Sequence, residues 1–438
     1  MLRWLLSTLT LLASWTALSI RADDWPQWRG ADRTGVSPEK GLLKAWPKDG
    51  PPLVWSFKNA GLGFSSYAIR DGKFFTLGTR DKQEIVLVLD AAKGTELWTA
   101  KIGEIFTFDG NTWGDGPRST PTLDGNLLYA LGGQGDLVCL DLIKNGGEVW
   151  RKNLIKDFDG EMMSDWGYSE SPLVDGDNVI VTPGSAKNGT IVALNKKTGA
   201  TVWQCKELTH KAPYSSAVVA EIHGVRQYVQ LSFAGDDKGG FVNGIEAKTG
   251  KLLWSQQIFS GASYAACPTP IVKDNVVYVT TGYGGGCHLF EIGKTMDAKD
   301  LYSKKVQKST KNTHGGVVLV DGHIYGHSEG LGWVCQELKG GKISWSEKNE
   351  FETRSGAITA ADGMLYFYTE EGEVGLVKAA TDGFDKVSSF KIPATSEFPA
   401  KLRTSRSSKA WSYPVIANGM LYVRDCEFIY CYDIREKK

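Results

Sequence analysis

The sequence predicts an all-β fold, an eight-bladed β-propeller of four-stranded antiparallel blades. Tails that end in tryptophan recur at Trp98, Trp150, Trp203 and Trp254, at intervals of 52, 53 and 51 residues. A turn dipeptide, most often Asp-Gly, precedes each tail inside an alternating run of β-branched and aromatic residues, which is typical of a β-hairpin. Eight such hairpins follow one another along the chain. Self-similarity at this period indicates a ring of repeated sheets.

Each repeat is expected to supply one strand before the turn dipeptide, one after it, a third such as "DLVCLD" at 136–141, and a fourth that ends in tryptophan. In the fifth and seventh repeats Tyr302 and Phe390 stand in place of that tryptophan. A seven-bladed ring is the alternative if one of these two repeats does not form. The predicted blades span residues 67–103, 118–154, 168–208, 214–258, 265–307, 312–351, 355–394 and 411–438.

The tryptophan tails have a structural explanation. In a tail such as "AKTGKLLW" at 247–254, Thr-Gly is expected to form the turn between the third and fourth strands. The indole then lies between neighbouring blades, where a large flat side chain fills the gap between two twisted sheets.

The segment "GPPLVWSF" at 50–57 resembles a tail that has no repeat in front of it, whereas the last repeat has three strands and no tail. We therefore expect the N-terminal strand to complete the C-terminal blade, which would close the ring and remove exposed strand edges. The predicted organisation is a signal peptide at 1–22, an N-terminal extension at 23–51 and one propeller domain at 52–438.

The first 22 residues have the composition of a secretory signal peptide. Arg3 provides a basic start, an apolar run extends from Trp4 to Ile20, and Ala22 is a small residue at the expected cleavage point. A retained membrane anchor is the alternative, although the run is at the short limit for spanning a bilayer. The mature protein is predicted to be exported to the periplasm or the extracellular space, as a monomer without an integral membrane segment.

The charge balance gives no sign of a polyanionic partner. The chain has 50 Lys and Arg against 50 Asp and Glu, and removal of Arg3 and Arg21 leaves a formal charge of −2. Because no long basic run occurs, nucleic acid is not expected as a partner.

Seven cysteines in an exported chain would allow disulfides, but the odd number argues against a complete framework. A bridge between Cys267 and Cys287, or one from Cys426 to a neighbour, is left open. Three cysteines occupy equivalent places in their repeats and are expected to be buried free thiols, namely Cys139, Cys335 and Cys431.

The run of tails with the pattern Thr-Gly-x-x-x-Trp resembles the pyrroloquinoline-quinone (PQQ) repeat. This repeat is the tryptophan-docking unit of quinoprotein alcohol dehydrogenases and of the non-enzymatic outer-membrane assembly-factor propeller. The resemblance covers residues 52–438. The stretches "DWPQWRG" at 24–30, "WGDGPRSTPTLDG" at 113–125 and "KNTHGG" at 311–316 are also similar to PQQ-like propeller proteins of planctomycete-type bacteria. The resemblance implies the fold more securely than an activity.

The dehydrogenase pattern is only partly present. In that family a disulfide between adjacent cysteines covers the quinone, and a Glu, an Asn and an Asp hold Ca²⁺ beside a catalytic Asp. This sequence has no adjacent cysteine pair and no Cys-x-x-Cys-His haem attachment. No cofactor is therefore firmly predicted, no catalytic residue is assigned, and PQQ with Ca²⁺ is the cofactor that the enzyme alternative requires.

Candidate ligand-binding residues lie in the loops that lead into the innermost strands, which meet at one mouth of the channel. Their positions correspond from repeat to repeat, so they are expected to converge around the axis. Aromatic faces and arginines suit a flat or anionic ligand through stacking and bidentate pairing with a carboxylate. Alternatively, Arg118 and Glu170 form structural ion pairs and the aromatic residues plug the channel. The candidates are Trp113, Arg118, Trp166, Tyr168, Glu170, Tyr214, His314 and Arg354, with Tyr264 and Trp411 in equivalent loops.

Four acids, Glu170, Asp236, Asp237 and Glu329, could contribute to a hard-cation site, because calcium requires several oxygen ligands. Loop acids are more often solvated, so no metal site is assigned. The sequence favours an exported, non-catalytic module that binds a small molecule or an envelope protein at its channel mouth. The alternatives are a PQQ-dependent dehydrogenase of an alcohol or sugar, and a scaffold for envelope assembly.

Overall fold

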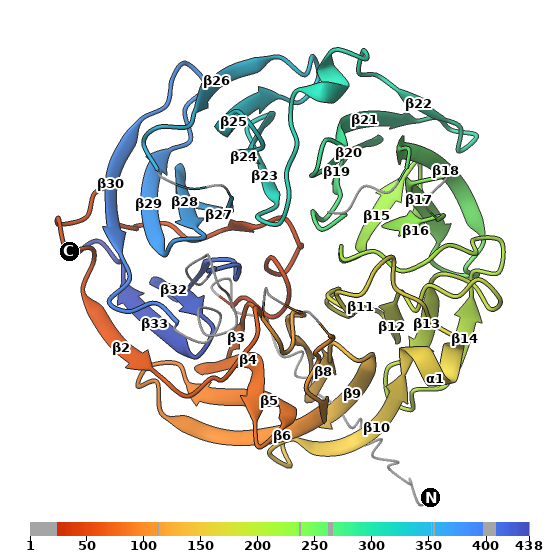
Figure 1. Ribbon diagram of the computed structural model, residues 1–438, viewed down its shortest axis with the longest axis horizontal. Coiled ribbons are helices and arrows are strands. Elements are labelled where there is room, and N and C mark those ends of the chain that lie inside the picture. The colour runs from red at the N-terminus through yellow and green to blue at the C-terminus, as the bar shows by residue number, and fades with distance from the viewer. Residues whose placement is uncertain are drawn as a thin grey trace, which may run out of the picture.

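The computed structural model describes residues 24–109, 111, 114–235, 238–261, 266–351, 353, 355–396 and 409–437. Within these residues eight sheets surround a central axis as the blades of a propeller (Figure 1). The predicted eight-bladed ring is confirmed, and the seven-bladed alternative is wrong because both degenerate repeats form complete sheets. The expected signal peptide lies outside the described residues.

The first four blades follow the chain in order, and each runs from the channel to the rim. Blade 1 consists of β3 (Ala68–Arg70), β4 (Lys73–Arg80), β5 (Gln83–Asp90) and β6 (Glu96–Glu104). Blade 2 consists of β7 (Thr122–Asp124), β8 (Leu127–Leu131), β9 (Asp136–Asp141) and β10 (Gly147–Asn153), followed by the short helix α1 (Leu154–Phe158). Blade 3 consists of β11 (Leu173–Asp175), β12 (Asn178–Val181), β13 (Val192–Asn195) and β14 (Thr201–Gln204). Blade 4 consists of β15 (Val218–Ile222), β16 (Val225–Phe233), β17 (Gly240–Glu246) and β18 (Leu252–Phe259).

The remaining blades complete the ring. Blade 5 consists of β19 (Ile271–Lys273), β20 (Val276–Thr281), β21 (Gly286–Ile292) and β22 (Ala298–Asp300), followed by the 3₁₀ turn η1 (Val306–Lys308). Blade 6 consists of β23 (Val317–Val320), β24 (His323–Ser328), β25 (Gly332–Glu337) and β26 (Ile343–Glu347). Blade 7 consists of β27 (Gly356–Ala361), β28 (Met364–Thr369), β29 (Glu373–Lys378) and β30 (Lys386–Lys391), with β1 (Val36–Ser37) added in parallel to β27. Blade 8 consists of β31 (Val415–Ala417), β32 (Met420–Asp425), β33 (Phe428–Asp433) and β2 (Leu53–Phe57).

Local chemistry and burial explain these strands. Asp71 and Gly72, between β3 and β4, both have positive φ, 51° and 71°, as a type I′ hairpin turn requires. All six residues of β28 are buried between neighbouring sheets, whereas outer strands such as β10 bury only one residue in seven. The hydrophobic core therefore lies between the blades.

The N-terminal strand closes the ring as predicted. Strand β2 pairs antiparallel with β33, with Leu53 opposite Tyr432 and Phe57 opposite Ile429. The edge of the last blade is thus covered by a strand that precedes the first blade in the sequence.

Indole groups connect several blades to the next one. Trp55 donates from Nε1 to the carbonyl of Ala91 at 2.9 Å, and Trp203 donates in the same way to Ala247 at 3.1 Å. In the fifth blade Tyr302 replaces tryptophan and its hydroxyl donates to the Leu338 carbonyl at 2.6 Å. The degenerate repeat therefore retains the hydrogen bond to the following blade.

The packing of the neighbouring blade explains why the tail pattern contains a glycine. Gly94 and Gly199 lie in the turns before the fourth strands of blades 1 and 3, with φ of 67° and 69°. A Cβ on Gly94 would lie 2.5 Å from the Trp55 ring, and one on Gly199 would lie 2.8 Å from the Trp150 ring. Each glycine leaves room for the indole of the preceding blade.

The cysteines are all described and are free thiols. The three expected to be buried are buried, and neither of the bridges left open is formed. In the described part of the chain no helix is long and apolar enough to span a membrane.

The N-terminal extension crosses the centre of the ring, where Figure 1 shows it in red. We call residues 24–39 the hub segment, because it makes a hydrogen bond to every blade or to the loop leading into it. Its partners, in blade order, are Trp25 with Ile69, Pro26 with Leu123, Arg33 with Ser171 and Pro172, Arg33 with Ala217, Trp28 with Thr269, Arg29 with Val317, Gly35 with Ala360, and Glu39 with Gly419.

Two buried arginines make four of these nine contacts. Arg33 donates from Nη1 to the carbonyls of Ser171 at 3.1 Å and Ala217 at 2.9 Å, and from Nη2 to Pro172. Arg29 donates from Nη2 to the Val317 carbonyl at 2.6 Å. Burial lowers the pKa of Arg33 to about 9, while Glu170 acts to raise it, so the guanidinium is charged at neutral pH.

Replacement of Arg33 by Met should destabilise the propeller. The change removes donors from three buried carbonyls and leaves Glu170 without its cation, so we expect the free energy of unfolding to fall by about 3–5 kcal/mol. Lys378→Met, which breaks the exposed pair with Asp385, should cost about 0–1 kcal/mol. Urea denaturation followed by tryptophan fluorescence measures the free energy of unfolding of both variants. Equal, small losses of stability would contradict a stabilising role of the hub segment.

Candidate functional site

A cavity of about 620 Å³ lies at the mouth of the channel where the innermost strands begin. The loops before these strands contribute from all eight blades, three hairpin turns add Tyr283, Glu329 and Glu370, and the hub segment adds Trp28. The remaining lining residues are Phe64, Arg118, Trp166, Ser169, Tyr214, Ser216, Cys267, Thr313, His314, Ser355, Lys409, Trp411 and Tyr413. Seven of the seventeen side chains are aromatic, so the walls suit a flat ligand.

Short hydroxyl side chains fix these loops to one another. The Thr120 amide donates to Ser171 Oγ at 2.9 Å, and the Ser171 amide donates to Ser216 Oγ at 2.8 Å. On the other side of the ring the hydroxyls of Thr313 and Ser355 are 3.1 Å apart. The loops of adjacent blades are therefore cross-linked below the cavity wall, which holds its side chains in place.

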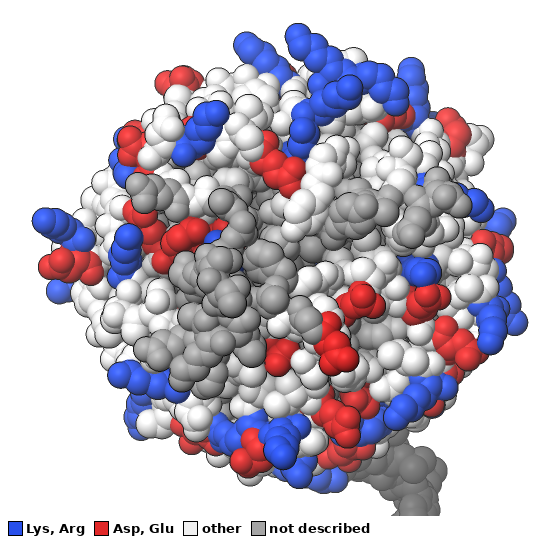
Figure 2. Space-filling model, viewed as in Figure 1, with Lys and Arg blue, Asp and Glu red and all other residues white. Residues whose placement is uncertain are grey.

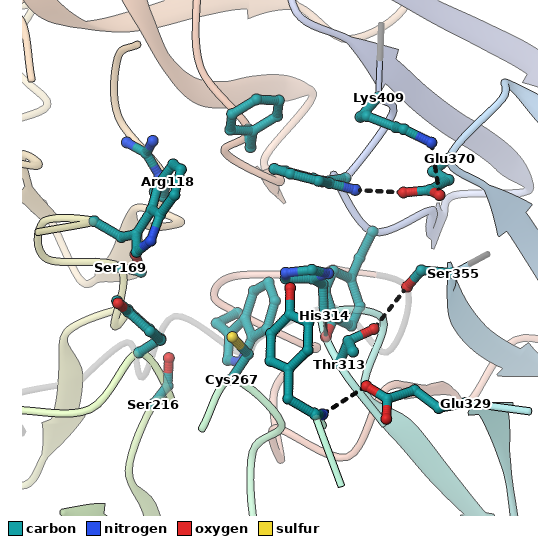
Figure 3. A pocket seen from close by; sticks show the side chains of 17 residues that line it. Arg118, Ser169, Ser216, Cys267, Thr313, His314, Glu329, Ser355, Glu370 and Lys409 are labelled. Atoms are coloured by element: carbon teal, nitrogen blue, oxygen red, sulfur yellow. Dashed lines mark hydrogen bonds and ion pairs between the residues drawn. The ribbon is translucent and has the colours of Figure 1, made fainter. Parts of the chain in front are cut away.

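Arg118 stands on one wall of the cavity (Figure 3). Its Nη1 donates to the Gly116 carbonyl at 2.8 Å and its Nη2 to the Gly114 carbonyl at 2.9 Å. The guanidinium also lies 4.4 Å from the centre of the Phe106 ring. Burial lowers the pKa of Arg118 to about 10 and Glu84 acts to raise it, so the group is charged at neutral pH. These contacts use two of its five N–H groups.

The opposite wall carries acids (Figure 3). Glu370 is 5 % exposed; its Oε1 lies 2.6 Å from Lys409 Nζ, and its Oε2 accepts from Trp411 Nε1 at 3.0 Å. Lys409 is also 3.2 Å from Glu371. One cation is shared by two carboxylates, which leaves this group one negative charge in excess.

Glu329 adds a second acid on that side. Its carboxylate accepts from the backbone amides of Tyr283 at 2.5 Å and Gly284 at 3.2 Å. Tyr283 has a φ of 51° and a side chain that is 56 % exposed at the cavity. The carboxylate thus holds the β20–β21 turn of blade 5 against the β24–β25 turn of blade 6.

His314 lies between the aromatic residues. It stacks on Trp411 with ring centres 4.8 Å apart, and its backbone carbonyl accepts from the Tyr413 hydroxyl at 2.6 Å. Burial lowers the pKa of His314 to about 4, with Glu370 opposing and Lys409 adding to the effect. Its Nδ1 is buried and has no hydrogen-bond partner among the described residues. The imidazole is therefore neutral.

Of the residues proposed from the sequence, the structure brings four together at the cavity: Arg118, Trp166, Tyr214 and His314, with Trp411 and Glu329 from the wider set. Tyr168 and Glu170 are buried beside it instead. The Tyr168 hydroxyl donates to the Pro183 carbonyl at 2.8 Å, and Glu170 accepts from Thr182 Oγ1 at 2.8 Å. Trp113, Arg354, Tyr264, Asp236 and Asp237 lie outside the described residues.

Several lining residues escaped sequence reasoning. Trp28 lies in "DWPQWRG", whose two tryptophans before a glycine were a visible signal. Glu370 stands in "TEEG", at the same second-to-third strand turn as Glu329 in "SEG", and the match between these turns could have identified it. Lys409 lies shortly before the hairpin of the last blade, much as Arg118 lies shortly before the hairpin of blade 2. The two distances agree to within a few residues.

The described residues that line the cavity do not fit a calcium–quinone site. The part of the chain that the structure describes contains no group of three or more His, Cys, Asp or Glu side chains arranged to hold a metal ion. Within the cavity, Glu370 is bound to Lys409 and Trp411, and Glu329 is bound to two backbone amides. Calcium requires several converging oxygens, which this donor set does not provide.

An eight-bladed ring with indoles between its blades and a loop-lined cavity at one mouth defines a PQQ-like β-propeller. The model of the family described as outer membrane protein assembly factor BamB matches residues 82–347. Because this is more than half of the chain, the protein belongs to that family.

Two curated relatives match parts of the chain. An outer membrane protein assembly factor BamB of Kangiella koreensis is 30% identical over 166 residues, which are 38% of this chain and 35% of the relative. A tetrathionate hydrolase of Acidithiobacillus ferrooxidans is 25% identical over 244 residues, 52% of this chain and 44% of the relative. The matches therefore cover less than half the length of either relative.

Solved structures of the same architecture are more distant in sequence. A quinohemoprotein alcohol dehydrogenase from Comamonas testosteroni has a TM-score of 0.63 at 14% identity, and the match covers 95% of this chain and 81% of that chain. BamB from Moraxella catarrhalis has a TM-score of 0.56 at 14% identity and covers 87% and 99%. At this identity the likeness shows the fold alone.

Glu170 should make stability depend on pH. Burial raises its pKa to about 7 from an ordinary 4.5, while Thr182, Arg33 and Gln230 act to lower it. Between these pH values the folded protein binds more protons than the unfolded chain, so the free energy of unfolding falls as the pH rises from 4.5 to 7. The group contributes at most about 3 kcal/mol to this fall.

In Glu170→Gln that contribution should vanish, so urea denaturation at pH 4.5 and pH 8 should show a smaller difference in stability than in the wild type. Glu84, whose pKa burial also raises to about 7, keeps part of the slope in both proteins. Glu221→Gln, an exposed change on β15, serves as the control. An unchanged slope in Glu170→Gln would mean that the carboxylate is fully charged in the folded protein over this range.

Proposed function

We propose that the protein is an exported, non-catalytic module that binds a small flat ligand carrying a carboxylate in the cavity at its channel mouth. The observation that carries the proposal is Arg118, a charged guanidinium on an aromatic wall that keeps N–H groups beyond those given to Gly114 and Gly116. A carboxylate accepts two parallel hydrogen bonds from such a group.

The size and lining of the cavity support a small molecule. About 620 Å³ is within the range of pockets that enclose drug-sized ligands, and such pockets combine apolar walls with a few placed polar groups. Trp28, Trp166 and Trp411 supply ring faces for stacking, while Ser216 and Thr313 supply hydroxyls. The misfit of the donor set to calcium favours binding over a quinone-dependent oxidation.

Export is supported by the sequence and by the family to which the chain belongs. The composition of residues 1–22 is that of a signal peptide, and the matching family is described as an outer membrane assembly factor. Figure 2 shows Lys and Arg side chains projecting mainly around the circumference of the ring, mixed with acids. Among the described residues on this face, the mixture of signs does not favour a polyanion.

Isothermal titration of the purified protein with 2-naphthoate tests the proposal. We expect saturable binding at one site, weakened at least about tenfold in Arg118→Met because a charge-assisted pair is lost. Arg435→Met, whose partner Asp433 lies at the exposed C-terminal end of β33, should bind as the wild type does. Absence of 2-naphthoate binding, or equal binding by Arg118→Met, would overturn the proposal.

Equilibrium dialysis against PQQ, with and without Ca²⁺, tests the enzyme alternative in parallel. The donor set predicts no calcium-dependent binding. Tight binding that requires Ca²⁺ would contradict this interpretation of the cavity and restore the dehydrogenase alternative.

A further inference from the structure

The cavity has opposite charges on opposite sides of the ring. Arg118 lies in the loop that leads into blade 2, and Glu329 lies in the β24–β25 turn of blade 6. In an eight-bladed ring these blades are four apart and therefore face each other across the axis. Glu370, in the β28–β29 turn of blade 7, stands next to Glu329 on the acidic side.

The acidic side has a net negative charge among the described lining residues. Lys409 is the one cation there, and it is already shared by Glu370 and Glu371 at 2.6 and 3.2 Å. None of the ion pairs of the described residues joins Glu329 to a cation. Its carboxylate instead accepts hydrogen bonds from two backbone amides. An ionised carboxylate has about four acceptor sites, so Glu329 retains acceptor capacity toward the cavity.

Aromatic side chains on the same side would favour a cation as well. Tyr283 and Trp411 line the cavity next to these acids, and the face of an indole or phenol ring attracts an ammonium group. His314, which stacks on Trp411, adds no opposing charge because its imidazole is neutral.

From the opposition of Arg118 to Glu329 and Glu370 across an aromatic cavity, we infer that the ligand is a zwitterion, with a carboxylate at one end, an ammonium group at the other and a flat body between them. The inference rests on the proposed function, because it assigns the second end of a ligand whose first end binds Arg118. It excludes simple aromatic acids as the preferred ligands.

A matched set of probes separates the two proposals. Isothermal titration would compare 2-naphthoate, 6-(aminomethyl)-2-naphthoate, 6-(hydroxymethyl)-2-naphthoate and 2-(aminomethyl)naphthalene on the wild-type protein. We expect the aminomethyl acid to bind about tenfold or more tightly than 2-naphthoate, because a hydrogen bond to a charged group is added. The hydroxymethyl acid should gain less, and the amine without a carboxylate should bind more weakly than the aminomethyl acid.

Glu329→Gln should reduce the ratio of the affinities for the aminomethyl acid and 2-naphthoate toward one, while Glu221→Gln on β15 should leave that ratio unchanged.

If 2-naphthoate binds but the aminomethyl group adds nothing, the zwitterion inference fails and the proposed function stands. A larger gain for the hydroxymethyl acid would also overturn it, in favour of a polyhydroxylated ligand. If no probe binds, the proposed function fails first. The comparison on the wild type decides the matter even if Glu329→Gln does not fold.

Discussion

Hydrogen bonding by one short segment in the channel is the constraint on which the rest of this propeller depends. The loops that begin the innermost strands direct backbone carbonyls toward the axis, and buried carbonyls require donors. Arg29 and Arg33 supply those donors as guanidinium groups, and charged donors form the stronger bonds. The same segment places Trp28 in the cavity wall, so the folding contact and the candidate site share one stretch of chain.

The ring geometry determines what the cavity can recognise. Loops at equivalent places in different blades necessarily face one another, so a charge in one blade meets whatever its counterpart carries across the axis. Arg118, in the loop leading into blade 2, and Glu329, in a hairpin turn of blade 6, have opposite signs on opposite sides of the axis, and aromatic residues occupy many places between them. The architecture that this chain shares with alcohol dehydrogenases and with BamB supplies the scaffold, whereas the chemistry belongs to the loops.

The fold was predictable from the sequence because its determinants are periodic and local. Turn dipeptides mark every blade, tryptophan tails mark most of them, and the unpaired tail at 50–57 indicated the closure. The site was predictable only in part. Ser169 lines the cavity, but its neighbour Glu170 turns into the blade toward Thr182, and the sequence does not give the orientation of adjacent loop residues. The path of the hub segment could not be predicted, because residues 24–39 have no period and their partners lie in eight blades that are distant in the sequence.

The contact between an indole and the glycine of the next blade also bears on how such rings change in size. The second and third repeats each contain a tryptophan for the blade after them and a glycine for the blade before them. Duplication or loss of either repeat would therefore keep the indole–glycine contact between the blades that become neighbours. The hub segment has no such tolerance, because its donors and acceptors are placed for eight blades at fixed angles. In this lineage a change in the number of blades would require a new N-terminal segment at the same time.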